Sequence, residues 1–345
     1  MKINYSRIFL LLVFVLGFFL RFNLLTSIPP GLGRDEVSVA YNAYSILKTG
    51  RDEHNRYLPL YFEAIGDQKL PVIIYLTVPS VALFGLTPLG TRFPEALLGS
   101  LTVVLSYFLV KQGLRNEKVK NLKALPYLTP LLIAINPWHI YHSRGAFEIC
   151  IGLFFITAAT YFLLKAVTQK WWYFVSLTLF IIAFYTYSMT RLLVPIILIY
   201  YLTVNRKQII ALPKKFILGL IGLGFILLLP FIINFFDPGG IFGPKGAVIL
   251  SSSYTKSVFL GFRSYVLNSS VSFLGPIFFN RIIMVFYEYL KNILTALSPG
   301  FYFANGSAVA GIGNIGQFYL VEIVPFIIGI VTAYRQIRAG NRFYK

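Results

Sequence analysis

Cysteine and charged residues are scarce in this chain. Cys150 is the one cysteine in 345 residues, which excludes a disulfide framework and a site built from several thiolate ligands. Charged residues make up 12% of the sequence, whereas hydrophobic residues make up 57%. A single soluble core could not bury so much apolar surface, and this composition therefore excludes a soluble globular protein.

The sequence contains several long apolar runs. Several approach the roughly 20 residues that a helix needs to cross a bilayer, and short charged or Pro/Gly-containing connections separate them. They predict an all-α polytopic membrane protein. The expected spans are residues 8–25, 92–111, 124–140, 146–165, 171–187, 191–204, 216–234 and 317–334. No small-residue cleavage site follows the first run, so we expect it to be retained as a helix.

One further apolar stretch, residues 70–84, contains two prolines and is short for a span. If it crossed the bilayer, the basic loop at residues 111–123 would fall outside, against the positive-inside rule. If it lies along the interface, every strongly basic loop falls inside, and we adopt this arrangement. The net charge of +19 then reflects membrane topology, not nucleic-acid binding. Of the 12 acidic residues, all but Glu117 fall outside.

This topology predicts a single transmembrane domain over residues 1–345, with two large outer loops at residues 26–91 and 235–316. Apolar residues recur at helical spacing in both loops. They predict one amphipathic helix at residues 36–47, with Val37, Ala40, Tyr41, Tyr44 and Leu47 on one face, and a second at about residues 278–297.

Two adjacent carboxylates, Asp35 and Glu36, follow the first span after a Pro- and Gly-rich turn at residues 29–33. A carboxylate near the bilayer surface could act as a general base, because low dielectric and a neighbouring acid raise its proton affinity. Alternatively, both acids begin a helix, since carboxylates in a first turn interact favourably with the helix dipole.

Asp67 and Lys69 end the first outer loop. Lys69 could bind a phosphate, or it could anchor the chain by extending its ammonium group from the interface into water. In the last short outer turn, Arg191 offers a planar guanidinium to a phosphate or carboxylate. Tyr187 beside it could line the same site or belong to the aromatic belt of the membrane.

Arg144 and Glu148 stand at a junction between two spans on the outer side. An acid at the lip of a span is costly and is a functional candidate for that reason. A local ion pair between the two, four residues apart, is the alternative. His139 and His142 could contact a substrate or a metal, but we expect them to anchor the interface.

In this order, these residues resemble the GT-C superfamily of membrane glycosyltransferases, specifically the protein O-mannosyltransferases (glycosyltransferase family 39) and the bacterial aminoarabinose transferases that modify lipid A. The resemblance extends over almost the whole chain. The matching segments are residues 34–36, 67–71, 91–99, 136–138, 143–144, 148, 185–187, 191, 298–303 and 316–322.

The resemblance implies a GT-C helical bundle with interfacial helices in its first outer loop, and a role for each candidate residue. Asp35 would be the base that activates an acceptor hydroxyl, Glu36 would support it, and Glu148 would be the acid of the next outer loop. The donor would be a polyprenyl-phosphate sugar, with its phosphate held by Lys69 and Arg191, to which Arg263 could contribute. The full set of substrate-binding candidates is Lys69, Asp67, Arg144, Arg191, Tyr187 and Arg263.

The resemblance also implies sugar transfer with inversion, to a protein, lipid or glycan acceptor on the outer face of the cell membrane. No acid cluster in the sequence demands a metal, although a divalent cation could assist. Members of the family usually have more spans, which implies that further C-terminal helices are missing here. The alternative function is a transporter or flippase of lipid-linked sugars, which should show inverted repeats and mid-span ionisable residues. The sequence shows neither.

Overall fold

A computed structural model of the chain describes residues 5–64, 67–115, 122–236, 260, 281–309 and 313–338. The chain divides into two compact units, one formed by Met1–Leu229 with Tyr334–Lys345 and the other by Pro230–Ala333. Both are predominantly helical, as the composition predicts.

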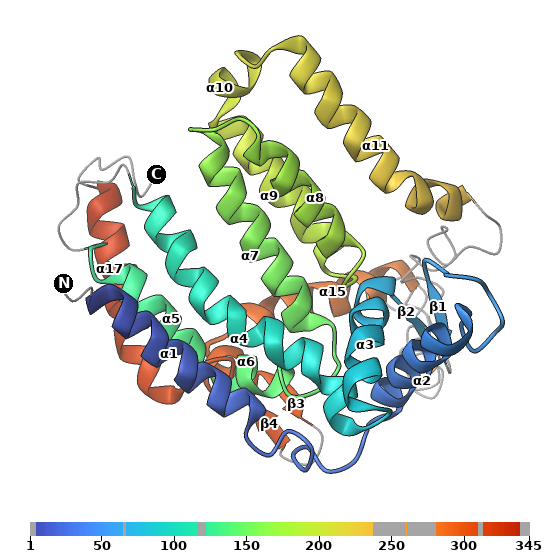
Figure 1. Cartoon of the computed structure of the whole chain (residues 1–345). Helices are drawn as coiled ribbons and strands as arrows, with labels where there is room; N and C mark the ends of the chain where they lie inside the picture. The colour runs from blue at the N-terminus through green and yellow to red at the C-terminus, as the bar shows by residue number, and fades with distance from the viewer. Residues whose placement is uncertain are drawn as a thin grey trace, which may run out of the picture. The chain divides into compact units, whose positions relative to one another are not determined.

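The first unit is a helical bundle in which α4 packs against α1, α5 and α7, while α7 packs against α8 (Figure 1). Its helices are α1 (Tyr5–Phe22), α2 (Arg34–Thr49), α3 (Pro71–Phe84), α4 (Pro88–Gly113), α5 (Leu125–Ile135), α6 (Pro137–His142), α7 (Ile149–Ala166), α8 (Trp172–Phe184), α9 (Thr190–Val204), α10 (Arg206–Ile210) and the larger part of α11 (Lys214–Phe236). A short antiparallel hairpin, β1 (Phe62–Ala64) and β2 (Asp67–Lys69), precedes α3 and pairs Phe62 with Lys69.

Seven of the eight predicted spans each correspond to one helix, with ends displaced by up to six residues, and the eighth is divided between two helices. Among the described residues, α1, α4, α7 and α11 are both long and apolar enough to cross a membrane. The helices α3, α5, α8 and α9 are apolar but shorter. Length therefore does not separate α3 from three predicted spans, and its interfacial position stays a prediction.

The span predicted at residues 124–140 is broken into α5 and α6. Pro137 has no backbone N–H to continue the ladder, and it occupies the first turn of α6, where no such donor is needed. The side-chain oxygen of Asn136 accepts a hydrogen bond from the backbone N–H of His139 at 2.8 Å and caps the new helix. Hydropathy continues through this point, and for that reason it did not reveal the break.

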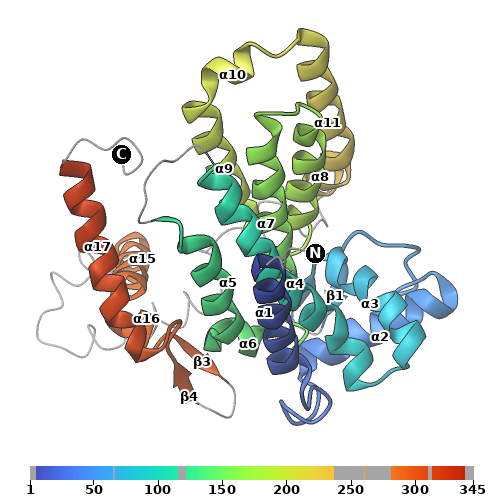
Figure 2. The same ribbon diagram turned by 60° about the vertical axis from the view of Figure 1, so that its left-hand side comes forward.

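The first outer loop folds around the predicted amphipathic helix, which is α2. One apolar cluster joins α2, β1, α3, the turn before α7 and α7 itself through Val39, Ala43, Ile46, Phe62, Ile73, Ile74, Val81, Ala146 and Ile151. The opposite face of α2 exposes Val37, Tyr41 and Tyr44. Ala40, predicted to share that face, is instead buried, with 2% of its surface exposed. Figure 2 shows α2 and α3 lying side by side.

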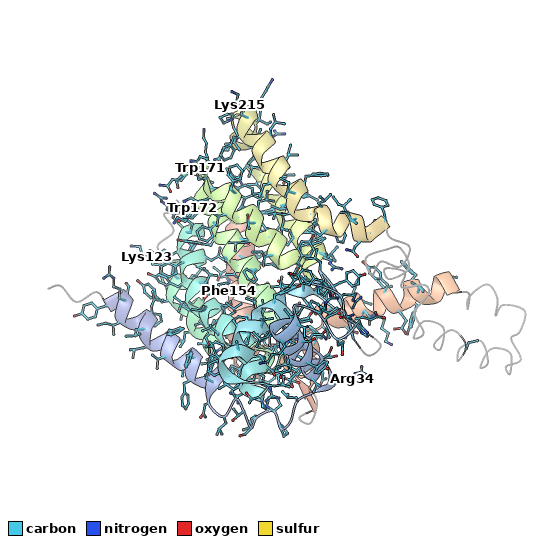
Figure 3. The ribbon with its side chains drawn as sticks, turned by 45° about the vertical axis from the view of Figure 1, so that its right-hand side comes forward. Arg34, Lys123, Phe154, Trp171, Trp172 and Lys215 are labelled. Atoms are coloured by element: carbon cyan, nitrogen blue, oxygen red, sulfur yellow. The ribbon has the colours of Figure 1, made fainter. Side chains whose placement is uncertain are left out.

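Two lysines and two tryptophans of the first unit lie apart from the start of α2. Figure 3 shows Lys123, Trp171, Trp172 and Lys215 toward one end and Arg34, at the start of α2, toward the other. Lys123 and Lys215, two of the bases predicted to lie inside, are therefore apart from the start of α2, and their location on the inner side of a membrane stays a prediction.

The second unit contains α15 (Arg281–Leu297), α16 (Pro299–Phe303), the hairpin of β3 (Ser307–Val309) and β4 (Gly313–Ile315), the 3-10 turn η3 (Leu320–Glu322) and most of α17 (Ile323–Arg338). The described part of the predicted amphipathic helix is confirmed as α15. The backbone N–H of Phe318 donates to the carbonyl of Tyr302 at 2.8 Å, and their rings stack. Gly316 lies so close to the Phe303 backbone that a Cβ atom would not fit.

Candidate functional site

A buried ion pair between Arg92 and Glu36 joins the start of α4 to the first turn of α2. The guanidinium Nε and Nη2 atoms lie 2.8 and 3.0 Å from the two carboxylate oxygens of Glu36, so the contact is bidentate. Arg92 is completely buried and Glu36 is 4% exposed. A pair so shielded from water holds its two helices in a fixed relation.

Both partners also bind backbone groups of the surrounding loops. Arg92 donates to the carbonyls of Leu25 and Pro29, each at 3.0 Å, and to that of Gly31. Glu36 accepts the backbone N–H of Gly33 at 2.9 Å and that of Ala146 at 3.2 Å. The pair therefore ties together the turn after α1, the start of α2, the start of α4 and the turn before α7.

These contacts keep Glu36 ionised. Burial raises the pKa of its carboxyl, but the hydrogen bonds from Arg92, Gly33 and Ala146 outweigh burial and leave the pKa below the ordinary value of 4.5. A carboxylate with all these donors around it suits positioning better than proton transfer. The hydrogen bond to Gly33 is also one half of a capping box, so the expectation that an acid begins this helix describes Glu36 correctly.

Asp35 points elsewhere. Its side chain is 49% exposed, and its Oδ1 atom lies 3.4 Å from the Nζ atom of Lys69 at the end of β2. The Lys69 side chain is 12% exposed. The structure thus brings together two residues predicted separately, one as a base and the other as a phosphate ligand, and leaves the carboxylate accessible.

Glu148 occupies the position before α7 in a left-handed backbone conformation, with φ of 68°. It interacts electrostatically with Glu95 of α4 and with Tyr187 in the turn before α9. Burial, and then the charge of Glu148, raise the pKa of Tyr187. The Oε1 atom of Glu95 accepts the backbone N–H of Cys150 at 2.7 Å in the first turn of α7.

Close packing connects this group of acids to the last outer turn. A Cβ atom on Gly152 would lie 3.3 Å from side-chain atoms of both Tyr187 and Thr190. Ala146 contacts Glu36, and Gly152, six residues later, packs against Tyr187. The start of α7 therefore connects the Glu36–Arg92 pair to Tyr187.

Arg144 makes backbone contacts that the sequence did not predict. Its guanidinium donates to the carbonyls of Leu20 at 2.9 Å, Arg21 at 3.2 Å and Ile28 at 3.0 Å. These bonds hold the end of α1 and the following turn, so the recorded donors of Arg144 point into the protein. These contacts differ from the local pair with Glu148 that was the alternative, and substrate binding by Arg144 stays a prediction.

Arg21 and His139 form a second buried polar centre. The Arg21 Nη2 atom lies 2.9 Å from Nδ1 of His139, and the guanidinium also donates to the carbonyls of Ile133 and Ala134 at the end of α5. A cation at a helix C-terminus complements the helix dipole there. His139 is 4% exposed, so the expected anchoring at the interface is wrong for this residue.

Arg191 is half-buried at the start of α9. Its Nε atom lies 3.4 Å from the carbonyl oxygen of Phe184, and its guanidinium stacks over the Phe184 ring, 5.5 Å from the centroid. These contacts orient Arg191 along the end of α8. Arg263 and the side chain of Asp67 lie outside the described residues.

The sequence interpretation did not single out Arg92, Glu95 or Arg21 as site residues. Each is an ionisable side chain at the edge of an apolar run, and such residues are costly to bury without a partner. That signal was present in the sequence. The partner of Arg92, 56 residues away, has no local signature. Among the described residues, no group of three or more His, Cys, Asp or Glu side chains is arranged to hold a metal ion.

Comparisons with known proteins agree with the fold. Residues 68–233 match the family model of dolichyl-phosphate-mannose-protein mannosyltransferases. Two solved structures of the oligosaccharyltransferase of Archaeoglobus fulgidus are similar to this chain. The apo form has a TM-score of 0.53 and 17% identity, and the similarity covers 99% of this chain and 46% of that one.

The complex with zinc and sulfate has a TM-score of 0.50 and 16% identity, and covers 84% of this chain and 39% of that one. The chain therefore spans less than half the length of these structures. No curated protein matches the sequence. Together with the apolar helices of the bundle, the family match and the two structures identify the chain as a multi-pass membrane protein with the GT-C glycosyltransferase fold.

Proposed function

We propose that this chain is a membrane glycosyltransferase that moves a sugar from a polyprenyl-phosphate donor to an acceptor hydroxyl on the outer face of the membrane. The observation that carries the proposal is the pair of Asp35 and Lys69, an accessible carboxylate 3.4 Å from an ammonium group. It lies beside the rigid Glu36–Arg92 pair, in a chain whose residues 68–233 match a mannosyltransferase family model.

The two groups have complementary roles in the proposed reaction. The Lys69 ammonium group attracts the phosphate of the donor and stabilises the negative charge that grows on it as the sugar departs. Asp35 accepts the proton of the acceptor hydroxyl. Glu36 holds the first turn of α2 through Arg92, so that Asp35 keeps its position.

The reaction is a single displacement. The acceptor oxygen forms a bond to the anomeric carbon while its proton passes to Asp35. The bond between that carbon and the phosphate oxygen breaks, and its electron pair stays with the lipid phosphate. Attack opposite the leaving group inverts the anomeric configuration, and a product that retained it would contradict this mechanism.

Glu148, Tyr187 and Arg191 form the second part of the proposed site. Glu148 and Tyr187 interact with each other, and Gly152 brings the start of α7 against the turn that carries Tyr187. These groups are suited to hold the sugar hydroxyls or the acceptor. The outer location rests on the positive-inside rule and on the separation of Arg34 from Lys123 and Lys215, two of the bases predicted to lie inside (Figure 3).

The test is transfer from a polyprenyl-phosphate sugar by Asp35→Asn protein in membranes. Loss of a general base should lower the rate by about 100-fold or more. Glu63→Gln is the matched control, because Glu63 is an exposed acid of the same loop and also lies near a cation, with its Oε2 atom 3.7 Å from Nη1 of Arg56. Undiminished transfer by Asp35→Asn would rule out the base.

A transporter or flippase gives a different result in the same preparation. It would move the lipid-linked sugar across the vesicle membrane without forming a glycosylated product. Neither the wild-type protein nor Asp35→Asn would then form product. Product formation by the wild-type protein, lost in Asp35→Asn and retained in Glu63→Gln, supports the transferase.

A further inference from the structure

A cavity of about 430 Å³ lies where α4 and α7 end, far from the candidate site. It is lined by Phe108, Lys111, Gln112, Arg115 and Tyr161. Its volume falls within the range of small-molecule sites in proteins. The proposed transfer reaction does not use any of these side chains.

The distance along α4 places this cavity at the second membrane interface. Lys111 follows Arg92 by 19 residues of one continuous helix, which is about 28 Å at 1.5 Å per residue. The hydrocarbon core of a bilayer is about 30 Å thick. If Arg92 lies near one interface, the cavity lies near the other, on the side of the basic loops.

The polar part of the cavity suits an anion. Two of its five lining side chains are cationic, one is an amide and none is acidic. Lys111 donates to the hydroxyl of Tyr107 at 3.2 Å, which leaves further ammonium hydrogens available. In the described part of the chain, the guanidinium of Arg115 makes no recorded hydrogen bond or ion pair, and its side chain is exposed.

The apolar part of the cavity suits a lipid. The rings of Phe108 and Tyr161 lie 6.4 Å apart between α4 and α7, and Phe108 is 40% exposed. Aromatic side chains at this depth contact the glycerol and upper acyl region, while basic side chains reach the headgroups. Basic pockets between membrane helices on the cytoplasmic side are suited to anionic lipid headgroups.

We infer that this cavity binds the phosphate headgroup of an anionic phospholipid from the leaflet opposite the candidate active site. Lys111 and Arg115 hold the phosphate, the amide of Gln112 adds a donor, and Phe108 with Tyr161 contacts the apolar part of the lipid. This site is independent of the proposed transfer reaction.

The test is native mass spectrometry of the full chain, released from mixed micelles of phosphatidylglycerol and phosphatidylcholine. The wild-type protein should retain phosphatidylglycerol in preference to phosphatidylcholine. Lys111→Gln/Arg115→Gln should retain it about 25-fold less, since each base near anionic lipid contributes a factor of about five. Lys170→Gln/Lys215→Gln is the matched control, because it removes two exposed bases of the same end from outside the cavity.

Equal retention by the wild-type protein and the cavity variant would overturn the inference, and so would equal loss in the two double variants, which would show diffuse surface attraction. Arg115→Gln alone guards against misfolding, because the exposed guanidinium makes no hydrogen bond or ion pair with the residues that the structure describes, and it should lower retention about fivefold. A separate titration with inorganic phosphate distinguishes the ligand sources. Displacement of the lipid by inorganic phosphate at equal concentration would assign the cavity to free phosphate and overturn the lipid assignment.

Discussion

Replacing Glu36 by glutamine should destabilise the protein far more than replacing its neighbour Asp35 by asparagine. The amide of Glu36→Gln has nearly the shape of the carboxylate, but it removes the negative charge and turns N–H groups toward Arg92, which is itself a donor. Breaking a buried ion pair by removing one partner costs about 3–5 kcal/mol. Losing one of the two backbone donors, Gly33 or Ala146, would add about 1 kcal/mol.

The adjacent substitution provides the comparison. The pair of Asp35 and Lys69 is half exposed on the carboxylate side, and exposed pairs contribute about 0–1 kcal/mol. The assay is thermal and denaturant unfolding of the purified protein in detergent, followed by the transfer assay. Asp35→Asn should keep its stability and lose transfer, whereas Glu36→Gln should lose stability. A free energy of unfolding for Glu36→Gln within about 1 kcal/mol of the wild type would refute the reasoning.

The remaining predictions concern pH, topology and packing. Because the pKa of Glu36 in the folded protein lies below 4.5, the carboxylate contributes to stability above that pH, and this contribution is lost as the pH falls through the folded pKa. Melting curves measured at several pH values should show this acid transition in the wild type and not in Glu36→Gln. Labelling with a membrane-impermeant maleimide tests the topology. Cys150 is fully buried and should stay unlabelled, Glu63→Cys should react from outside, and Lys170→Cys should react only after the membrane is opened. The reverse order of reaction for the two variants would overturn the topology. Gly152→Val should push α7 away from the turn that carries Tyr187, lower the rate of transfer and lower the free energy of unfolding by about 1–3 kcal/mol. Unchanged activity and stability would contradict the close approach of Gly152 to this turn.

The sequence was sufficient for the helices but not for their polar connections. Apolar runs predicted each span, and helical spacing predicted α2 and α15, because burial in lipid or against a neighbour leaves a periodic signature. The break at Asn136–Pro137 escaped the hydropathy pattern because capping depends on one side chain. Asp35 and Lys69 could each be predicted as a site residue, but their contact depends on the hairpin of β1 and β2, which carries Lys69.

The roles of Glu36 and Arg144 could not be predicted in the same way. Glu36 meets Arg92, and Arg144 meets three carbonyls more than 100 residues before it. Contacts of such sequence separation depend on how the helices pack, and nothing local in the chain encodes them. For the same reason, an arginine four residues before a glutamate suggested a local ion pair, whereas the guanidinium of Arg144 donates to distant backbone carbonyls.

The two adjacent acids at the start of α2 have a consequence for the length of the preceding turn. Successive side chains of an α-helix are about 100° apart, so one step separates the carboxylate that faces Arg92 from the one that faces Lys69. An insertion or deletion of one residue in residues 29–33 would rotate α2 relative to Arg92 unless the turn absorbed the change. The number of residues between the carbonyl partners of Arg92 and the start of α2 is therefore as constrained as the two acids. A homologue whose turn is one residue longer or shorter should lose one of the two contacts.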